Sequence, residues 1–182
     1  MSSKILMFFH FLFLLHITFS CKEVSQREKE LTQVLNKTVN VEMINQIYQG
    51  ENTLLFSDLK KKYKYISIVY LKDKCSPCYP KFKEWLKKIN LIDPPNTYSV
   101  LFVIHADSYD AFFQNSDDLE LLKDNFFIFL DKENHFFDSN SNISEWIYES
   151  SFMINEKNEM KMVGPPFFNE DFTAIFHKIV SF

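Results

Sequence analysis

The stretch from residue 65 to residue 90 constrains the fold of this chain more than any other part of the sequence. Residues 65–71 are rich in β-branched and aromatic side chains, which is typical of a central strand. Residues 79–90 follow with apolar side chains at helical spacing, which predicts an amphipathic helix. The positions expected to be buried on this helix are Phe82, Trp85, Leu86 and Ile89.

Two cysteines lie in the loop between this strand and this helix. The motif Cys75-Ser76-Pro77-Cys78 places both sulfur atoms near the first turn of the helix, where the helix dipole and free N–H groups favour a thiolate. Pro77 suits an early helical position because its missing N–H group has no intrahelical partner to lose. We expect Cys75 to be the more exposed thiol, which attacks a substrate disulfide, and Cys78 to resolve the mixed disulfide.

Charged side chains surround the pair. Lys72 and Lys74 would lower the pKa of Cys75 because a positive charge stabilises a thiolate, and Asp73 would act against them. The polar side of the following helix is expected to be a solvated surface. It consists of Lys81, Lys83, Glu84, Lys87 and Lys88.

The segments after this unit predict two more strands with a helical region between them. Residues 98–104 and 126–130 are apolar runs of strand length. Strands that alternate with helices predict a largely parallel sheet with helices on both faces. The apolar positions of the helical region are Phe112, Phe113, Leu119 and Leu122.

The C-terminal part predicts an antiparallel hairpin and a final helix. Residues 147–154 and 159–163 are the expected hairpin strands, joined by a polar turn. A helix capped by Asn169 or Asp171 follows. Its expected buried stripe consists of Phe172, Ile175, Phe176 and Ile179.

The first residues have the composition of an export signal. Lys4 precedes an almost unbroken apolar run over residues 5–19, which is shorter than the roughly 20 residues of a membrane-spanning helix. The small residue Ser20 follows this run directly before a cysteine. This pattern predicts a signal peptide over residues 1–20.

Cys21 would then be the first residue of the exported chain. Its position resembles that of the lipid-modified cysteine of a bacterial lipoprotein, and the alternative is ordinary cleavage that leaves a free thiol. Residues 21–34 are expected to form a polar tether from the membrane to one domain over residues 35–182. A net charge of −4 argues against binding to nucleic acid, which requires a basic surface.

The order of these elements resembles the thioredoxin-like fold, and in particular the TlpA-like branch of Bacteroidota lipoproteins. The segment Phe152-Met153-Ile154-Asn155 matches the Phe-Leu-Ile-Asp strand end of that family, and Met162-Val163-Gly164-Pro165 matches the strand exit that follows. The resemblance implies a thiol–disulfide oxidoreductase of the cell envelope, facing the periplasm or the cell surface. Its redox-active disulfide would be Cys75–Cys78. Its partners would be protein thiols or disulfides and a second redox protein, and it would need no cofactor.

The chain departs from the thioredoxin-like pattern at three positions. Members of the family commonly have Trp before the first cysteine, where this chain has Lys74, and a buried acid six residues upstream, where it has Val69. The cis-proline that faces the cysteine pair would fall near Glu149. A carboxylate at that place would raise the pKa of Cys75.

The cysteine pair is also compatible with two roles that involve no thiol exchange. A Cys-x-x-Cys motif can be half of a zinc site, but a zinc ion usually takes four ligands, or three and a water molecule. The remaining candidates are Cys21 and the scattered His105, His135 and His177, so no metal site is predicted. The pair could also be an inert disulfide or spare thiols in a non-catalytic thioredoxin-like lipoprotein that binds a partner or ligand.

Overall fold

The computed structural model describes residues 24–50, 52–92, 95–113 and 126–181. The chain divides into two compact units, residues 1–32 and residues 33–182. The predicted signal peptide and Cys21 lie outside the described residues, so both stay predictions. In the part of the chain that the structure describes, no helix has the length and apolar character needed to cross a membrane.

Helix α2 (Gln26–Val34) begins in the first unit and ends in the second. Its first turn has a capping box: the N–H of Glu28 donates to Ser25 Oγ (3.2 Å), and the N–H of Ser25 donates to the Glu28 carboxylate (2.8 Å). Most of the segment 21–34, which was predicted as a polar tether, is therefore helical. Val34 is buried in the core of the second unit.

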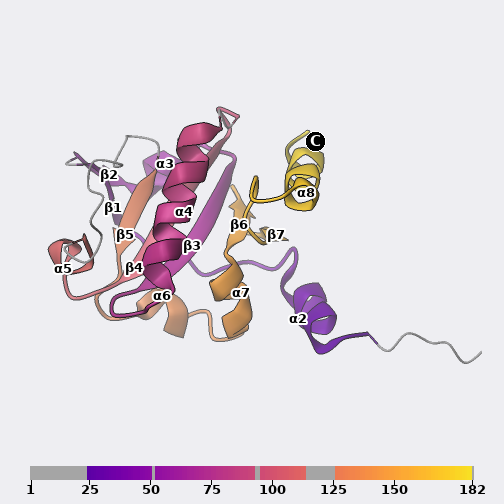
Figure 1. Cartoon of the computed structure of the whole chain (residues 1–182), viewed down its shortest axis with the longest axis horizontal. Coiled ribbons are helices and arrows are strands. Elements are labelled where there is room, and N and C mark those ends of the chain that lie inside the picture. The colour runs from indigo at the N-terminus through magenta and orange to yellow at the C-terminus, as the bar shows by residue number, and fades with distance from the viewer. Residues whose placement is uncertain (1–23, 51, 93–94, 114–125, 182) are drawn as a thin grey trace, which may run out of the picture. The chain divides into compact units, whose positions relative to one another are not determined.

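A seven-stranded sheet forms the centre of the second unit (Figure 1). Its strands lie in the order β2-β1-β5-β4-β3-β6-β7. Their bounds are β1 (Gln46–Gln49), β2 (Asn52–Leu55), β3 (Tyr65–Lys72), β4 (Tyr98–His105), β5 (Phe127–Leu130), β6 (Phe152–Asn155) and β7 (Met160–Val163). The helices that pack around the sheet are α3 (Phe56–Lys62), α4 (Cys78–Leu91), α5 (Tyr109–Phe113), α6 (His135–Asp138), α7 (Glu145–Ser150) and α8 (Glu170–Val180).

The three central strands of this sheet are parallel. β3 pairs with β4, and β4 pairs with β5, both in parallel. On the other edge of β3, β6 pairs with β3 and β7 pairs with β6, both antiparallel. The predicted α/β fold with a C-terminal hairpin is confirmed. The sheet has fewer parallel strands than expected, because the hairpin β1–β2, which was not predicted, adds two antiparallel strands beside β5.

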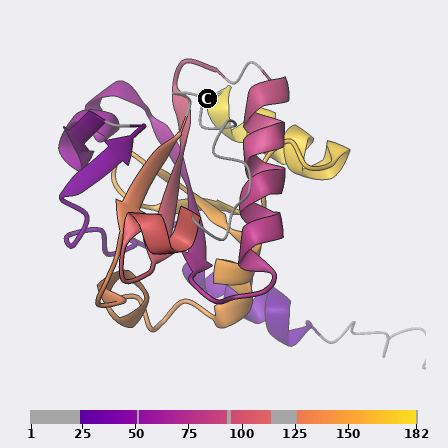
Figure 2. The ribbon, with the colours of Figure 1, turned by 60° about the vertical axis from the view of Figure 1, so that its left-hand side comes forward.

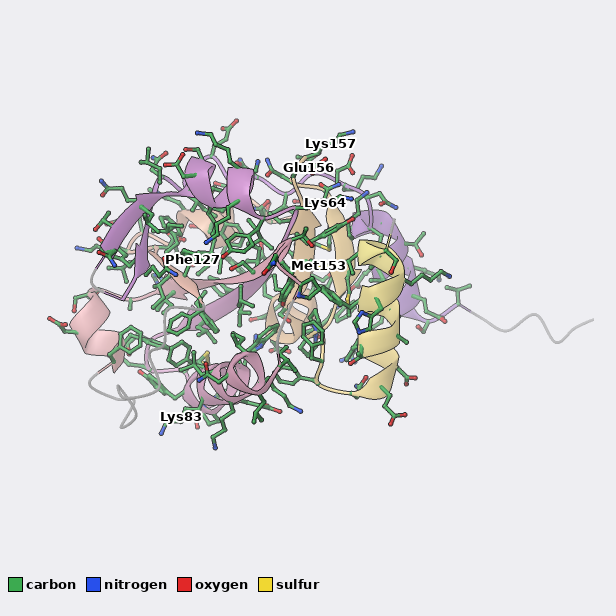
Figure 3. The ribbon with its side chains drawn as sticks, turned by 90° about the horizontal axis from the view of Figure 1, so that it is seen from above. Lys64, Lys83, Phe127, Met153, Glu156 and Lys157 are labelled. Carbon is green, nitrogen blue, oxygen red and sulfur yellow. A yellow bond between two sulfur atoms is a disulfide. The ribbon has the colours of Figure 1, made fainter. Side chains whose placement is uncertain are left out.

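The side chains of β3 alternate between two hydrophobic cores, since successive residues of a strand point to opposite faces. Ile66, Ile68 and Tyr70 join the core that also contains side chains of α3, α6 and α7. Val69 and Leu71 join the core formed with α4, α5 and α8. Figure 2 shows α4 lying along one face of the sheet, and Figure 3 shows α3 on the opposite side.

Helix α4 fixes the position of the cysteine loop. The aromatic ring of Phe82 contacts Phe102 of β4 edge-on, with 4.8 Å between the ring centroids. Lys83 points away from the sheet on the outer side of the helix (Figure 3). The four residues predicted to be buried are at most 4% exposed, which confirms this face of the helix: Phe82, Trp85, Leu86 and Ile89.

Helix α5 covers the first part of the helical region predicted between β4 and β5. Phe112 and Phe113 are buried there, as expected. The ring of Phe112 contacts Phe82 of α4, with 5.7 Å between the centroids. Leu119 and Leu122 lie outside the described residues.

The segment before β6 corrects the predicted secondary structure. A strand was expected over residues 147–154, but α7 occupies residues 145–150 and β6 begins at Phe152. Ile147 and Tyr148 of α7 are both buried. A short apolar run fits a buried helix face as well as a strand, and tertiary packing decides between the two.

Helix α8 begins as predicted, because the Asn169 side chain accepts a hydrogen bond from the N–H of Phe172 (2.8 Å). Phe176 is completely buried. The prediction for Ile175 is wrong, since this side chain is 47% exposed. Adjacent residues of a helix point in different directions, so Ile175 and Phe176 do not share one narrow stripe.

Candidate functional site

The cysteine pair lies between the C-terminal end of β3 and the start of α4. Cys75 and Cys78 are joined by a disulfide, and their Cα atoms are 5.3 Å apart. The N–H of Cys78 donates to the carbonyl of Cys75 (2.9 Å), and Pro77 precedes the helix at a helical φ of −77°. The prediction that the motif opens this helix is confirmed, with Cys78 as the first helical residue.

The two sulfur atoms have different surroundings. Cys78 is 9% exposed, and its Sγ accepts a hydrogen bond from the N–H of Lys72 (3.3 Å). Cys75 is half-buried and therefore more accessible. Cys75 has the exposure expected of an attacking thiol and Cys78 that of a resolving thiol.

Asp73 fixes the loop before the pair. Its carboxylate accepts hydrogen bonds from the Tyr79 hydroxyl (2.6 Å) and from the N–H of Lys74 (2.8 Å). Lys74 has a left-handed backbone conformation, at φ 58°, and an exposed side chain. The Lys72 ammonium lies over the ring of Phe137, 4.9 Å from its centroid. The expected effect of these charges on the pKa of the attacking thiol stays a prediction.

A cavity of about 430 Å³ opens beside the disulfide. Its aromatic wall consists of Tyr70, Phe137 and Tyr148, and the Tyr148 ring lies 5.3 Å from Tyr70 and 4.9 Å from Phe137. The Tyr70 hydroxyl donates a hydrogen bond to the side-chain carbonyl of Asn134. Burial, and secondarily the Asp131 carboxylate, raise the pKa of Tyr70, so this hydroxyl stays protonated.

Charged side chains from α4 and α7 form another part of the cavity wall: Lys81, Glu145 and Glu149. The Lys81 Nζ donates to the carbonyl of Tyr148 (3.0 Å) and has a longer contact of 3.5 Å with the carbonyl of Tyr70. Burial lowers the pKa of Lys81 to about 8, and Glu149 acts in the opposite direction. The prediction that Lys81 belongs to a solvated surface is therefore wrong.

Besides Lys74, two positions depart from the thioredoxin-like pattern, and they have distinct structural outcomes. Val69 is completely buried in an apolar core, and Glu149 lines the same cavity as the cysteine pair. The described part of the chain contains no cis peptide bond. Where the cis-proline was expected, the last turn of α7 is found, followed by Ser151 at φ 72° and ψ 165°.

The histidines considered as zinc ligands belong to separate elements. A ring nitrogen of His105 contacts the carbonyl of Asp131 (3.0 Å), while His135 begins α6 and His177 lies on α8. Within the described ranges, no group of three or more His, Cys, Asp or Glu side chains is placed to hold a metal ion.

Sequence reasoning missed Lys81 and the aromatic wall. Lys81 follows Cys78 by three residues, and this spacing puts both on one helix face, so it was a usable signal. The aromatic side chains come from β3, α6 and α7, which are distant in the sequence. Only the folded chain brings them together.

Comparisons with solved structures identify the fold. The thioredoxin domain of a thiol-disulfide oxidoreductase from Bacteroides vulgatus superposes with a TM-score of 0.53 and 13% identity, covering 80% of this chain and 97% of that domain. A candidate electron transport protein from Aquifex aeolicus gives a TM-score of 0.55 and 13% identity, covering 79% of this chain and 96% of that protein. A thioredoxin-like protein from Bacteroides caccae superposes with a TM-score of 0.50 and 12% identity. This match covers 85% of this chain and 52% of that protein.

The chain therefore has a thioredoxin-like fold, as its sequence pattern indicated. A Cys-x-x-Cys pair at disulfide distance lies at the start of its helix α4. No protein-family model matches the sequence, and no curated protein matches it either.

Proposed function

We propose that this protein is an exported thiol–disulfide oxidoreductase that a lipid on Cys21 tethers to the cell envelope. The observation that carries the proposal is the Cys75–Cys78 disulfide at the first turn of α4, with its two sulfur atoms unequally exposed. A helix N-terminus stabilises a thiolate, and unequal exposure separates an attacking thiol from a resolving one.

In the reducing direction, the Cys75 thiolate attacks a protein disulfide, forms a mixed disulfide and releases one substrate thiolate. The Cys78 thiolate then attacks Cys75 Sγ, the bond to the substrate breaks, and the second substrate thiolate leaves. Two electrons pass from the pair to the substrate, and a second redox protein restores the dithiol. The same steps in reverse oxidise substrate thiols.

The main alternative is a non-catalytic role, in which the cavity beside the pair binds a partner or ligand. The observation that favours it is the replacement of the expected cis-proline segment by α7 and Glu149. In that case the disulfide would only hold the start of α4 in place.

Trapping the mixed disulfide separates these functions. In the native envelope, Cys78→Ser should accumulate disulfide-linked adducts through Cys75, because the resolving thiol is absent. Cys75→Ser is the matched control, since it keeps one thiol of the pair but removes the attacking one, and it should give no adducts. Equal adduct levels in both variants, or none in either, would refute the oxidoreductase.

The tether is tested separately. Mass spectrometry of the exported chain should find the N-terminus at Cys21 with a lipid attached, and Cys21→Ser should release the protein from the membrane fraction. An unmodified Cys21, or a start at another residue, would contradict the anchor and leave the redox proposal unaffected.

A further inference from the structure

Lys81 stands out among the lysines of α4 by its place on the helix. It follows Cys78 by three residues and therefore lies one helical turn away, on the same side. Both side chains line the cavity beside the disulfide. Lys83, two residues further on, points away from the sheet (Figure 3).

Near the C-terminal end of β3, the strand edge on the side of β6 holds both side chains. The pairing of β6 with β3 ends at Ile68. Beyond this point the N–H of Lys72 donates a hydrogen bond to Cys78 Sγ (3.3 Å). The Lys81 Nζ donates to the carbonyl of Tyr70 at the longer distance of 3.5 Å. Residues two apart on a strand direct their backbone groups to the same edge. Cys78 Sγ and Lys81 Nζ are therefore held by the same strand edge, at backbone groups two residues apart.

The groups around Lys81 allow it to exist as a neutral amine. Burial lowers the pKa of Lys81 to about 8, although Glu149 raises it somewhat, so roughly a tenth of the molecules have neutral Lys81 at pH 7. A neutral amine keeps two N–H groups for its two carbonyl partners and has one lone pair for a proton. The titratable groups that line the cavity with it are Tyr70 and Lys72 of β3, Cys75 and Cys78 of the motif, and Glu145, Tyr148 and Glu149 of α7.

We propose that Lys81 is the proton acceptor for the Cys78 thiol when the mixed disulfide is resolved. This inference rests on the proposed oxidoreductase function. The S–H proton of Cys78 moves to the Lys81 amine, and Cys78 Sγ attacks Cys75 Sγ. The bond between Cys75 and the substrate sulfur breaks, and the departing thiolate takes the proton from the Lys81 ammonium. The pair ends as a disulfide, the substrate is reduced, and no other reactant is needed.

The position of the buried acid in thioredoxin-like proteins is Val69 in this chain, and Val69 has no group that accepts a proton. Lys81 reaches the cavity from α4 instead of from β3. The attacking thiol needs no such acceptor, because the N-terminus of a helix favours the thiolate over the thiol. Loss of Lys81 should therefore slow the second step of the reaction and leave the first step nearly unchanged.

Single-turnover reaction with dithiobis(nitrobenzoate), an aromatic disulfide, measures the two steps separately. The reduced full chain carrying Cys21→Ser releases thionitrobenzoate twice: first when Cys75 attacks, at a rate proportional to reagent concentration, and then when Cys78 resolves the adduct, at a rate independent of it. The leaving group needs no proton, so the second phase reports deprotonation of Cys78. We expect this phase to accelerate with pH and to level off above pH 8.

Three variants decide the proposal. Lys81→Met and Lys81→Arg should both slow the second phase at pH 7 by about tenfold or more, and neither should show the plateau, because methionine has no base and arginine keeps its proton. The first phase should change by less than about twofold. Lys83→Met, the control on the outer side of α4, should match the parent protein.

A second phase at the parent rate in Lys81→Arg would overturn the proposal, since the positive charge alone would then suffice. An unchanged pH profile in Lys81→Met would overturn it as well. A parent protein that shows no reagent-dependent first phase would instead refute the oxidoreductase function, and the inference would fall with it.

Discussion

Replacement of Ser151 by glycine should stabilise the protein. Ser151 connects α7, which lines the cavity, to β6, and its φ of 72° with ψ of 165° lies in a region that essentially only glycine occupies. Such a conformation costs a residue with a side chain about 1–3 kcal/mol. The residue is also 1% exposed, and its Oγ has no hydrogen-bond partner, which costs about 1–3 kcal/mol more.

Glycine removes both costs but adds about 0.5–1 kcal/mol of unfavourable flexibility in the unfolded chain. We therefore expect Ser151→Gly to raise the free energy of unfolding by about 2 kcal/mol. Ser151→Ala removes only the unpaired hydroxyl, so its gain should be about 1 kcal/mol. Urea unfolding of the oxidised protein measures the difference, and the midpoint for the glycine variant should rise by about 1 M.

Ser150→Gly is the matched control for this experiment. Ser150 is the last residue of α7, and its hydroxyl donates to the carbonyl of Trp146 (2.8 Å). Glycine there should lower stability by about 1 kcal/mol. The reasoning is refuted if Ser151→Gly is no more stable than the parent protein, or if alanine stabilises as much as glycine.

Three further predictions concern stability. Gly164→Ala should destabilise the protein by about 2 kcal/mol or more in thermal unfolding. A Cβ at this position would lie 2.4 Å from the Phe172 ring, and the backbone φ of 107° is strained for any residue with a side chain. An unchanged unfolding midpoint would contradict this prediction. Asn169→Ala should cost about 1 kcal/mol through the lost cap of α8, and a urea midpoint equal to the parent's would exclude that role. Lys81 loses its proton at about pH 8 when folded and at about pH 10.5 when unfolded, so the unfolded state binds more protons between these values. The free energy of unfolding of the oxidised protein should rise there by about 1 kcal/mol per pH unit relative to Lys81→Met, and parallel pH curves for the two proteins would count against it.

The central part of the fold was predictable from the sequence because its side-chain pattern is unambiguous. β3 and β4 are apolar runs buried on both faces, and α4 has a clear apolar face. Both follow directly from the periodicity of strand and helix. The cysteine motif then marks the start of α4, which accounts for the correct position of Cys75 and Cys78.

The outer elements were less predictable because tertiary contacts decide their structure. The strand β2 consists entirely of exposed residues, so no apolar pattern marks it, and pairing with β1 makes it a strand. Residues 147–150 suit a strand by composition but form α7. The aromatic wall of the cavity depends on α6 and α7, so it could not be predicted before those elements were placed.

The reduction potential of the Cys75–Cys78 couple tests the central claim most directly. The full chain carrying Cys21→Ser would be equilibrated in glutathione and dithiothreitol buffers of graded potential, and free thiols would be counted by mass after alkylation. We predict a midpoint between about −100 and −300 mV, the range of exchanging redox pairs. A pair that stays oxidised well below about −300 mV would be a structural disulfide and would contradict the redox function.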